Sequence, residues 1–142
     1  MNLIQVAAIC GMLSPIVYTL AWILGGFLVP GYSHIKKDVS SLFAVGAHKR
    51  WLFASFFITN SVLSFIFSFS LMWSIEGDGS IVGPILFIIS TFLGVVVAIF
   101  FPLDEGGEMK TFRGKMHLIV IIISGILILA SMIFFWLRMK DL

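Results

Sequence analysis

Two stretches of the chain carry side chains whose types suit ligand binding or catalysis. Residues 30–50 and residues 103–117 hold all three histidines, together with carboxylates and hydroxyls. The candidate ligand-binding residues are Ser33, His34, Asp38, Ser40, His48, Asp104 and His117. Imidazole nitrogens and carboxylate oxygens are good zinc ligands, and three or four are sufficient. The alternative is therefore a metal site built from His34, Asp38, His48, Asp104 and His117.

The spacing of these residues does not match a known catalytic motif. There is no His-Glu-x-x-His pair for a metalloprotease and no Gly-x-Ser-x-Gly elbow for a serine hydrolase. Histidines in loops are mostly solvated polar residues, so we favour that interpretation for His34 and His48 over a zinc site. Ser40 fits a helix cap better than a nucleophile. We expect no cofactor, with zinc as the alternative, and whether the protein is an enzyme stays open.

His117 differs from the other histidines because it falls inside an apolar stretch of the chain. An ionisable residue inside a membrane span is costly and is a functional hypothesis by default. Asp104 lies just beyond the preceding apolar stretch, so the two side chains can meet where two helices end. We predict that His117 and Asp104 lie in or near hydrogen-bond contact, either as a structural ion pair or as part of a site.

The elements that position these residues follow from where charges are missing. The chain has 142 residues, of which 60% are hydrophobic and 11% charged, far fewer charges than a soluble domain carries. Charge-free gaps lie before Lys36 and over residues 51–75, 79–103 and 116–137. A bilayer core needs about 20 apolar helical residues, and backbone groups in lipid must be satisfied within the segment. Each gap therefore predicts one membrane-spanning helix.

We predict an all-α integral membrane protein, a single domain over residues 1–142 built as an antiparallel bundle of four transmembrane helices. The helices are expected over residues 3–29, 51–74, 81–101 and 116–137. The short connection at residues 76–79 predicts a hairpin between the second and third. Trp22 falls within the first span and is expected to pack inside. In the first loop, residues 38–46 predict a short interfacial helix, with Asp38 as its N-cap and Gly46 as its stop.

Basic residues are unevenly distributed between the two sides of this bundle. The side of the long loops, residues 30–50 and 103–115, holds seven Lys and Arg residues against two on the other side. By the positive-inside rule, these loops are predicted to be cytoplasmic and both termini outside, in the cell membrane. The same basic residues suit anionic lipid headgroups, although they serve as ordinary topology determinants more often. The net charge of +2 is too small to suggest nucleic acid.

Two segments resemble the signatures of an uncharacterised prokaryotic membrane family, domain of unknown function family 998. The first is Pro30-Gly31-Tyr32-Ser33 followed by Asp38-Val39-Ser40-Ser41-Leu42, and the second is Phe101-Pro102-Leu103-Asp104 with Gly114 and His117. The two segments occur in the right order at the right helix ends. The resemblance implies a multi-pass membrane protein and draws attention to Asp38, Ser40, Asp104 and His117, but it implies no activity. Family members usually have more helices than the four that fit here, so a site built on an additional pair would be absent.

These observations favour a protein that binds a small ligand or a lipid headgroup in a polar pocket at the membrane interface, or a subunit of a membrane assembly. The alternative function is a membrane-embedded metal-dependent hydrolase that acts on a lipid through the His and Asp cluster. Membrane lipids are the expected partners, and a homodimer is compatible with so small a bundle.

Overall fold

Four long helices make up most of the computed structural model, which describes residues 2–74 and 81–140. They are α1 (Leu3–Leu28), α2 (Arg50–Ser74), α3 (Val82–Phe100) and α4 (Phe112–Met139). Each is long and apolar enough to cross a membrane, and no strand occurs in these described residues. The predicted all-α membrane fold is therefore confirmed. The predicted turn at residues 76–79 lies outside the described residues.

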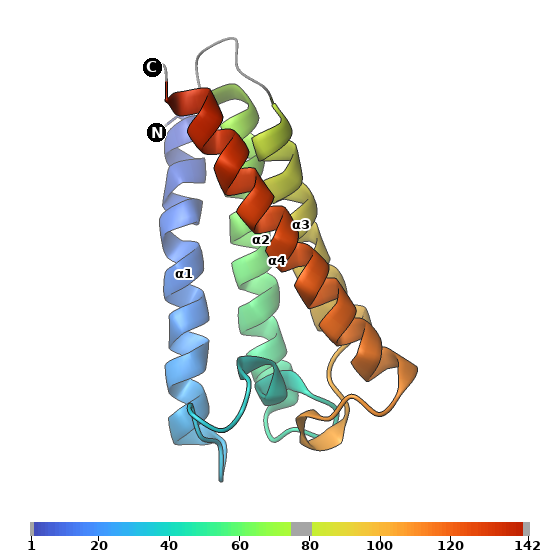
Figure 1. Ribbon diagram of the computed structural model, residues 1–142. Helices are drawn as coiled ribbons and strands as arrows, with labels where there is room; N and C mark the ends of the chain where they lie inside the picture. Colours follow the sequence, from blue (N-terminus) through green and yellow to red (C-terminus); the bar gives the residue numbers. More distant parts are fainter. Residues whose placement is uncertain (1, 75–80, 141–142) are drawn as a thin grey trace.

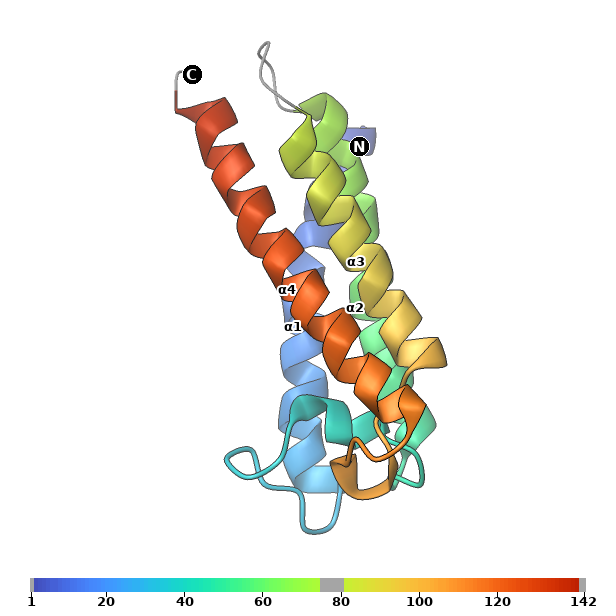
Figure 2. The same ribbon diagram turned by 45° about the vertical axis from the view of Figure 1, so that its right-hand side comes forward.

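The helices run antiparallel, with the two termini at one end and the two long loops at the other (Figure 1). Each helix packs on the next one in sequence, α1 on α2, α2 on α3 and α3 on α4. Among the described residues, α1 and α4 barely touch, and α4 is tilted across the other helices (Figures 1 and 2). We call the end that carries the first loop and residues 101–111 the loop end.

Hydroxyl groups join neighbouring helices inside the bundle. The Ser14 hydroxyl of α1 donates to Asn60 Oδ1 of α2 over 2.8 Å, and the hydroxyls of Ser90 on α3 and Ser124 on α4 lie 2.8 Å apart. Near the other end, the buried Ser131 hydroxyl donates to the Gly83 carbonyl over 2.9 Å. Such contacts satisfy polar groups that lipid cannot hydrogen-bond and hold adjacent helices together.

The short helix predicted in the first loop is present as a 3₁₀ helix, η1 (Val39–Phe43), and is shorter than predicted. Asp38 occupies the N-cap position, but its side chain makes no capping hydrogen bond, and the helix ends before Gly46. Leu42 and Phe43 are buried in a cluster with residues of α1 and α2. Leu42 can pack this deeply because residue 25 of α1 is a glycine, and a Cβ atom there would lie only 2.7 Å from Leu42 Cδ1. The first loop is therefore anchored in the core at the loop end.

Candidate functional site

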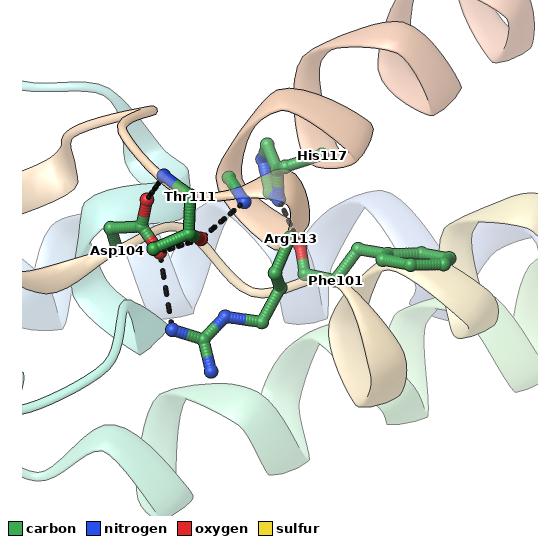
Figure 3. A network of polar contacts seen from close by, with 6 residues as sticks. Phe101, Asp104, Thr111, Arg113 and His117 are labelled. Atoms are coloured by element: carbon green, nitrogen blue, oxygen red, sulfur yellow. Dashed lines mark hydrogen bonds and ion pairs between the residues drawn. The ribbon is translucent and has the colours of Figure 1, made fainter.

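Asp104 organises the connection between α3 and α4. Its carboxylate accepts hydrogen bonds from the Thr111 backbone N–H at 2.7 Å, from the Thr111 hydroxyl at 2.6 Å and from Arg113 Nη2 at 3.1 Å (Figure 3). Thr111 is also the N-cap of α4, because its hydroxyl accepts from the Gly114 N–H at 3.3 Å. These bonds extend α4 to Phe112, so the helix begins earlier than residue 116, where its apolar stretch begins. Asp104 therefore fixes the start of α4.

The same contacts set the charge state of Asp104. The hydrogen bonds from Thr111, followed by the hydrogen bond and the positive charge of Arg113, lower the pKa of the Asp104 carboxyl to about 2. Hydrogen bonding to the charged form and a nearby cation both favour the carboxylate. Asp104 is thus an anion whose two carboxylate oxygens both accept hydrogen bonds from Thr111 or Arg113. This arrangement suits a structural role better than catalysis.

Two glycines allow the chain to fold this tightly around Asp104. Gly106 has a φ of 76°, a left-handed conformation that favours glycine, and places the connection in a turn that returns to Asp104. At Gly114, a Cβ atom would lie 2.5 Å from Asp104 Oδ2 and 2.9 Å from Met109 Cα. No side chain fits at residue 114 without movement of the connection. The second family-like segment is accordingly a structural unit in this chain.

His117 is buried in the second turn of α4, with 4% of its surface exposed. Its Nδ1 lies 2.7 Å from the carbonyl oxygen of Phe101, at the end of α3 (Figure 3). In the part of the chain that the structure describes, no hydrogen bond joins His117 to Asp104. The direct hydrogen bond that the prediction allowed is therefore absent from these residues, because Thr111 and Arg113 bind the carboxylate and Phe101 binds the imidazole. Both residues nevertheless tie α3 to α4, which is the structural alternative considered for the pair.

A cavity of about 440 Å³ lies at the loop end between α1, the first loop and α4, and we call it the loop-end cavity. Four of the seven candidate residues line it: His34, Asp38, Ser40 and His117. The remaining lining residues are Tyr18, Trp22, Lys37, Val39, Leu103, Met109, Leu118 and Ile121. Its volume falls in the range of small-molecule sites, and its mixture of apolar walls and a few polar groups is typical of them.

An aromatic cluster forms the α1 side of the loop-end cavity. The Trp22 and His34 rings meet edge to face with centroids 4.6 Å apart, and Tyr32 contacts His34 with centroids 5.2 Å apart. His34 reaches this position because it lies directly over Gly26, where a Cβ atom would collide with its ring. Trp22 is 38% exposed, so the prediction that it packs inside is wrong, since the cavity leaves its ring partly uncovered.

Tyr32 adds an unpaired donor next to this cluster. Its hydroxyl is buried and has no hydrogen-bond partner in the described residues. Burial is the main reason that the pKa of Tyr32 is raised, with smaller contributions from Tyr18 and Asp38. Tyr32 itself lines a second, smaller hollow formed with the first loop rather than the loop-end cavity.

The other candidate residues lie elsewhere. His48 lines a separate hollow of about 290 Å³ with Lys37, Ser41 and Glu105. The Ser33 carbonyl accepts from the Lys36 and Lys37 backbone N–H groups in a turn of the first loop. Within residues 2–74 and 81–140, no group of three or more His, Cys, Asp or Glu side chains is arranged to hold a metal ion. Three of the five candidate zinc ligands, His34, Asp38 and His117, line the loop-end cavity, but in the described residues they are not arranged to hold a metal ion.

The fold and the site together define a multi-pass helical membrane protein with its polar residues concentrated at the loop end. The chain belongs to the family described as protein of unknown function (DUF998), which matches residues 12–140. This match includes both signature segments and confirms the resemblance seen in the sequence. No curated protein and no solved structure matches the chain.

Proposed function

We propose that the protein binds the headgroup of a membrane lipid in the loop-end cavity. The observation that carries this proposal is the lining of the cavity, with polar residues of the first loop and His117 of α4 at the loop end and apolar residues farther along α1 and α4. Leu118 and Ile121 on α4 line its apolar part and are each 44% exposed. Because these exposed side chains belong to a membrane-spanning helix, the cavity opens toward lipid rather than toward water alone.

The length of the helix supports the same ligand. Ile121 lies nine residues after the start of α4 at Phe112, or about 14 Å at 1.5 Å per residue. One leaflet of the hydrocarbon core is about 15 Å thick. A lipid of the loop-side leaflet would thus place its headgroup among His34, Lys37 and Asp38, and its acyl chains along Leu118 and Ile121.

Apolar grooves at the opposite end of the helices have a different character. One of about 430 Å³ is lined by residues of α2, α3 and α4, including Phe67, Phe87 and Trp136, and another of about 440 Å³ lies between α1 and α2. Both have almost entirely apolar linings and suit acyl chains without headgroup recognition. The polar groups of the loop-end cavity distinguish it as the headgroup site.

Blocking the cavity tests the proposal. We expect Ile121→Trp to fill its apolar part and to remove a phospholipid that the wild-type protein retains in native mass spectrometry after gentle detergent extraction. The matched control is Ile122→Trp, since Ile122 is 52% exposed on the same helix and does not line the cavity. Equal lipid retention by wild type and both variants would overturn the proposal.

We further propose that residues 30–50 and 103–115 face the cytoplasm and that the termini lie outside the cell membrane. The seven-to-two distribution of Lys and Arg supports this orientation. In a Cys10→Ser background, a membrane-impermeant thiol reagent added to intact cells should label Gly77→Cys and spare Lys37→Cys. The reverse labelling pattern would contradict the orientation.

We also propose that the protein forms a homodimer or serves as a subunit of a membrane assembly, for which the largely exposed α1 and α4 provide the surface.

A further inference from the structure

The charged groups of the loop-end cavity do not neutralise one another. Lys37 and Asp38 are adjacent in sequence and both line the cavity. In the described residues, neither side chain takes part in an ion pair or a hydrogen bond. Both are exposed at the rim of the cavity. A positive and a negative side chain at the same cavity, neither of them paired within the described residues, are complementary to a ligand that carries both charges.

His117 supplies a second acceptor to the cavity that Asp38 lines. A carbonyl oxygen accepts hydrogen bonds and cannot donate them, so His117 Nδ1 must donate to Phe101. In the neutral ring, Nε2 is then an acceptor, and it has no partner in the described part of the chain. Asp38 and His117 both line the loop-end cavity. The Asp38 carboxylate and the His117 imidazole therefore present two acceptors to the same cavity.

The aromatic wall completes the complementarity to a cation. Trp22 and Tyr18 of α1 line the cavity together with Asp38. Aromatic faces attract ammonium groups, and tryptophan does so best. In a site at the edge of the hydrocarbon core, this attraction is less screened than in water. The cavity thus combines a cation-binding side of Asp38, His117 and Trp22 with a single exposed lysine.

We propose that the bound lipid is a zwitterionic phospholipid with a primary ammonium headgroup, that is, a phosphatidylethanolamine. This inference rests on the proposed function of the cavity. Lys37 faces the phosphate, and the ammonium donates N–H bonds to the Asp38 carboxylate and to His117 Nε2, beside the Trp22 ring. Phosphatidylcholine keeps both charges but has no N–H to donate, and phosphatidylglycerol lacks the cation.

The N-methylated series of phosphatidylethanolamine tests the proposal, because each methyl group removes one N–H and retains the charge. Lipids with identical acyl chains would compete for the purified protein in native mass spectrometry, with phosphatidylglycerol as a further competitor. We expect occupancy to fall along the series, and phosphatidylethanolamine to exceed phosphatidylcholine by about tenfold or more, the factor that one hydrogen bond to a charged group supports. Asp38→Asn should weaken this preference, because the charged acceptor becomes a neutral amide while His117 Nε2 still accepts. Glu108→Gln is the matched control, since Glu108 pairs with Lys110 and does not line the cavity.

The possible results separate the two proposals. Equal occupancy by all the lipids, with loss in Ile121→Trp, would overturn the headgroup assignment and leave lipid binding intact. Retention of every lipid by Ile121→Trp would instead place the lipid elsewhere and overturn both. An unchanged preference in Asp38→Asn would also overturn the assignment. Displacement of the lipid by micromolar glycerophosphoethanolamine would identify a soluble ester as the ligand and overturn the lipid source.

Discussion

Gly114→Ala is expected to destabilise the protein, although alanine is a much better helix former than glycine. In a helix interior, the exchange of glycine for alanine is worth about 1 kcal/mol in favour of alanine. At Gly114 the added Cβ would lie 2.5 Å from Asp104 Oδ2 and 2.9 Å from Met109 Cα, well inside the separation of about 3.5–4.0 Å that non-bonded atoms prefer. Neither neighbour can rotate away, because one is backbone and the other is held by Thr111 and Arg113.

The magnitude follows from these opposing effects. Insertion of an extra methyl group into a well-packed region typically costs about 1–3 kcal/mol, and more when backbone must move. Here the shift also disturbs the hydrogen bonds that Asp104 makes to the start of α4. After the gain in helix propensity of about 1 kcal/mol is subtracted, we expect a net loss of up to about 2 kcal/mol in the free energy of unfolding.

Gly125 provides a matched control on the same helix. No atom lies within 4 Å of the position that its Cβ would take, so Gly125→Ala should retain or raise stability by up to about 1 kcal/mol. The assay is reversible unfolding in mixed micelles by titration with sodium dodecyl sulfate, followed by circular dichroism. If Gly114→Ala were as stable as Gly125→Ala, the proposed role of the contact between Asp104 and Gly114 would be refuted.

Three further predictions concern charge, helix packing and metal. The pKa of Asp104 is lower in the folded state than its unfolded value of about 3.9, so its ionised form stabilises the fold at pH values above that value. Stability should therefore fall as the pH drops from about 4 toward 2. Asp104→Asn should flatten this decline. Ser14→Ala removes a contact between α1 and α2 and should cost about 0.6 kcal/mol, and at most about 1.7, whereas Ser55→Ala should cost less, since its hydroxyl bonds within its own helix. Elemental analysis of the purified protein should find no stoichiometric zinc, and zinc that is lost in His117→Ala would instead support the hydrolase alternative.

The helices could be predicted from sequence because their determinant is local. A charge-free stretch of sufficient length becomes a helix in lipid whatever its neighbours do, and the first three helices accordingly begin and end within a residue or so of their predicted bounds. The start of α4 differs because it depends on hydrogen bonds from Thr111 and Arg113 to Asp104, which the distribution of charges does not reveal. The Thr111 N-cap was the available signal, three residues before Gly114.

The site was less predictable because it depends on how the loops return to the bundle. Asp104 and His117 were reasonable partners by position, but the tight turn at Gly106 brings nearer neighbours to the carboxylate. Trp22 looked like a packing residue, because the sequence does not show that α1 and α4 diverge and leave its ring beside a cavity. The adjacent glycines at positions 25 and 26 were the overlooked indication that the first loop packs closely on α1.

The most direct measurement of the central claim is a crystal structure grown from a lipidic mesophase that contains phosphatidylethanolamine. We expect density for a phospholipid headgroup in the loop-end cavity, with its phosphate near Lys37, its amine between Asp38 and His117, and an acyl chain along Leu118 and Ile121. Ordered water filling the cavity, with lipid bound only along the outer faces of the helices, would contradict the account.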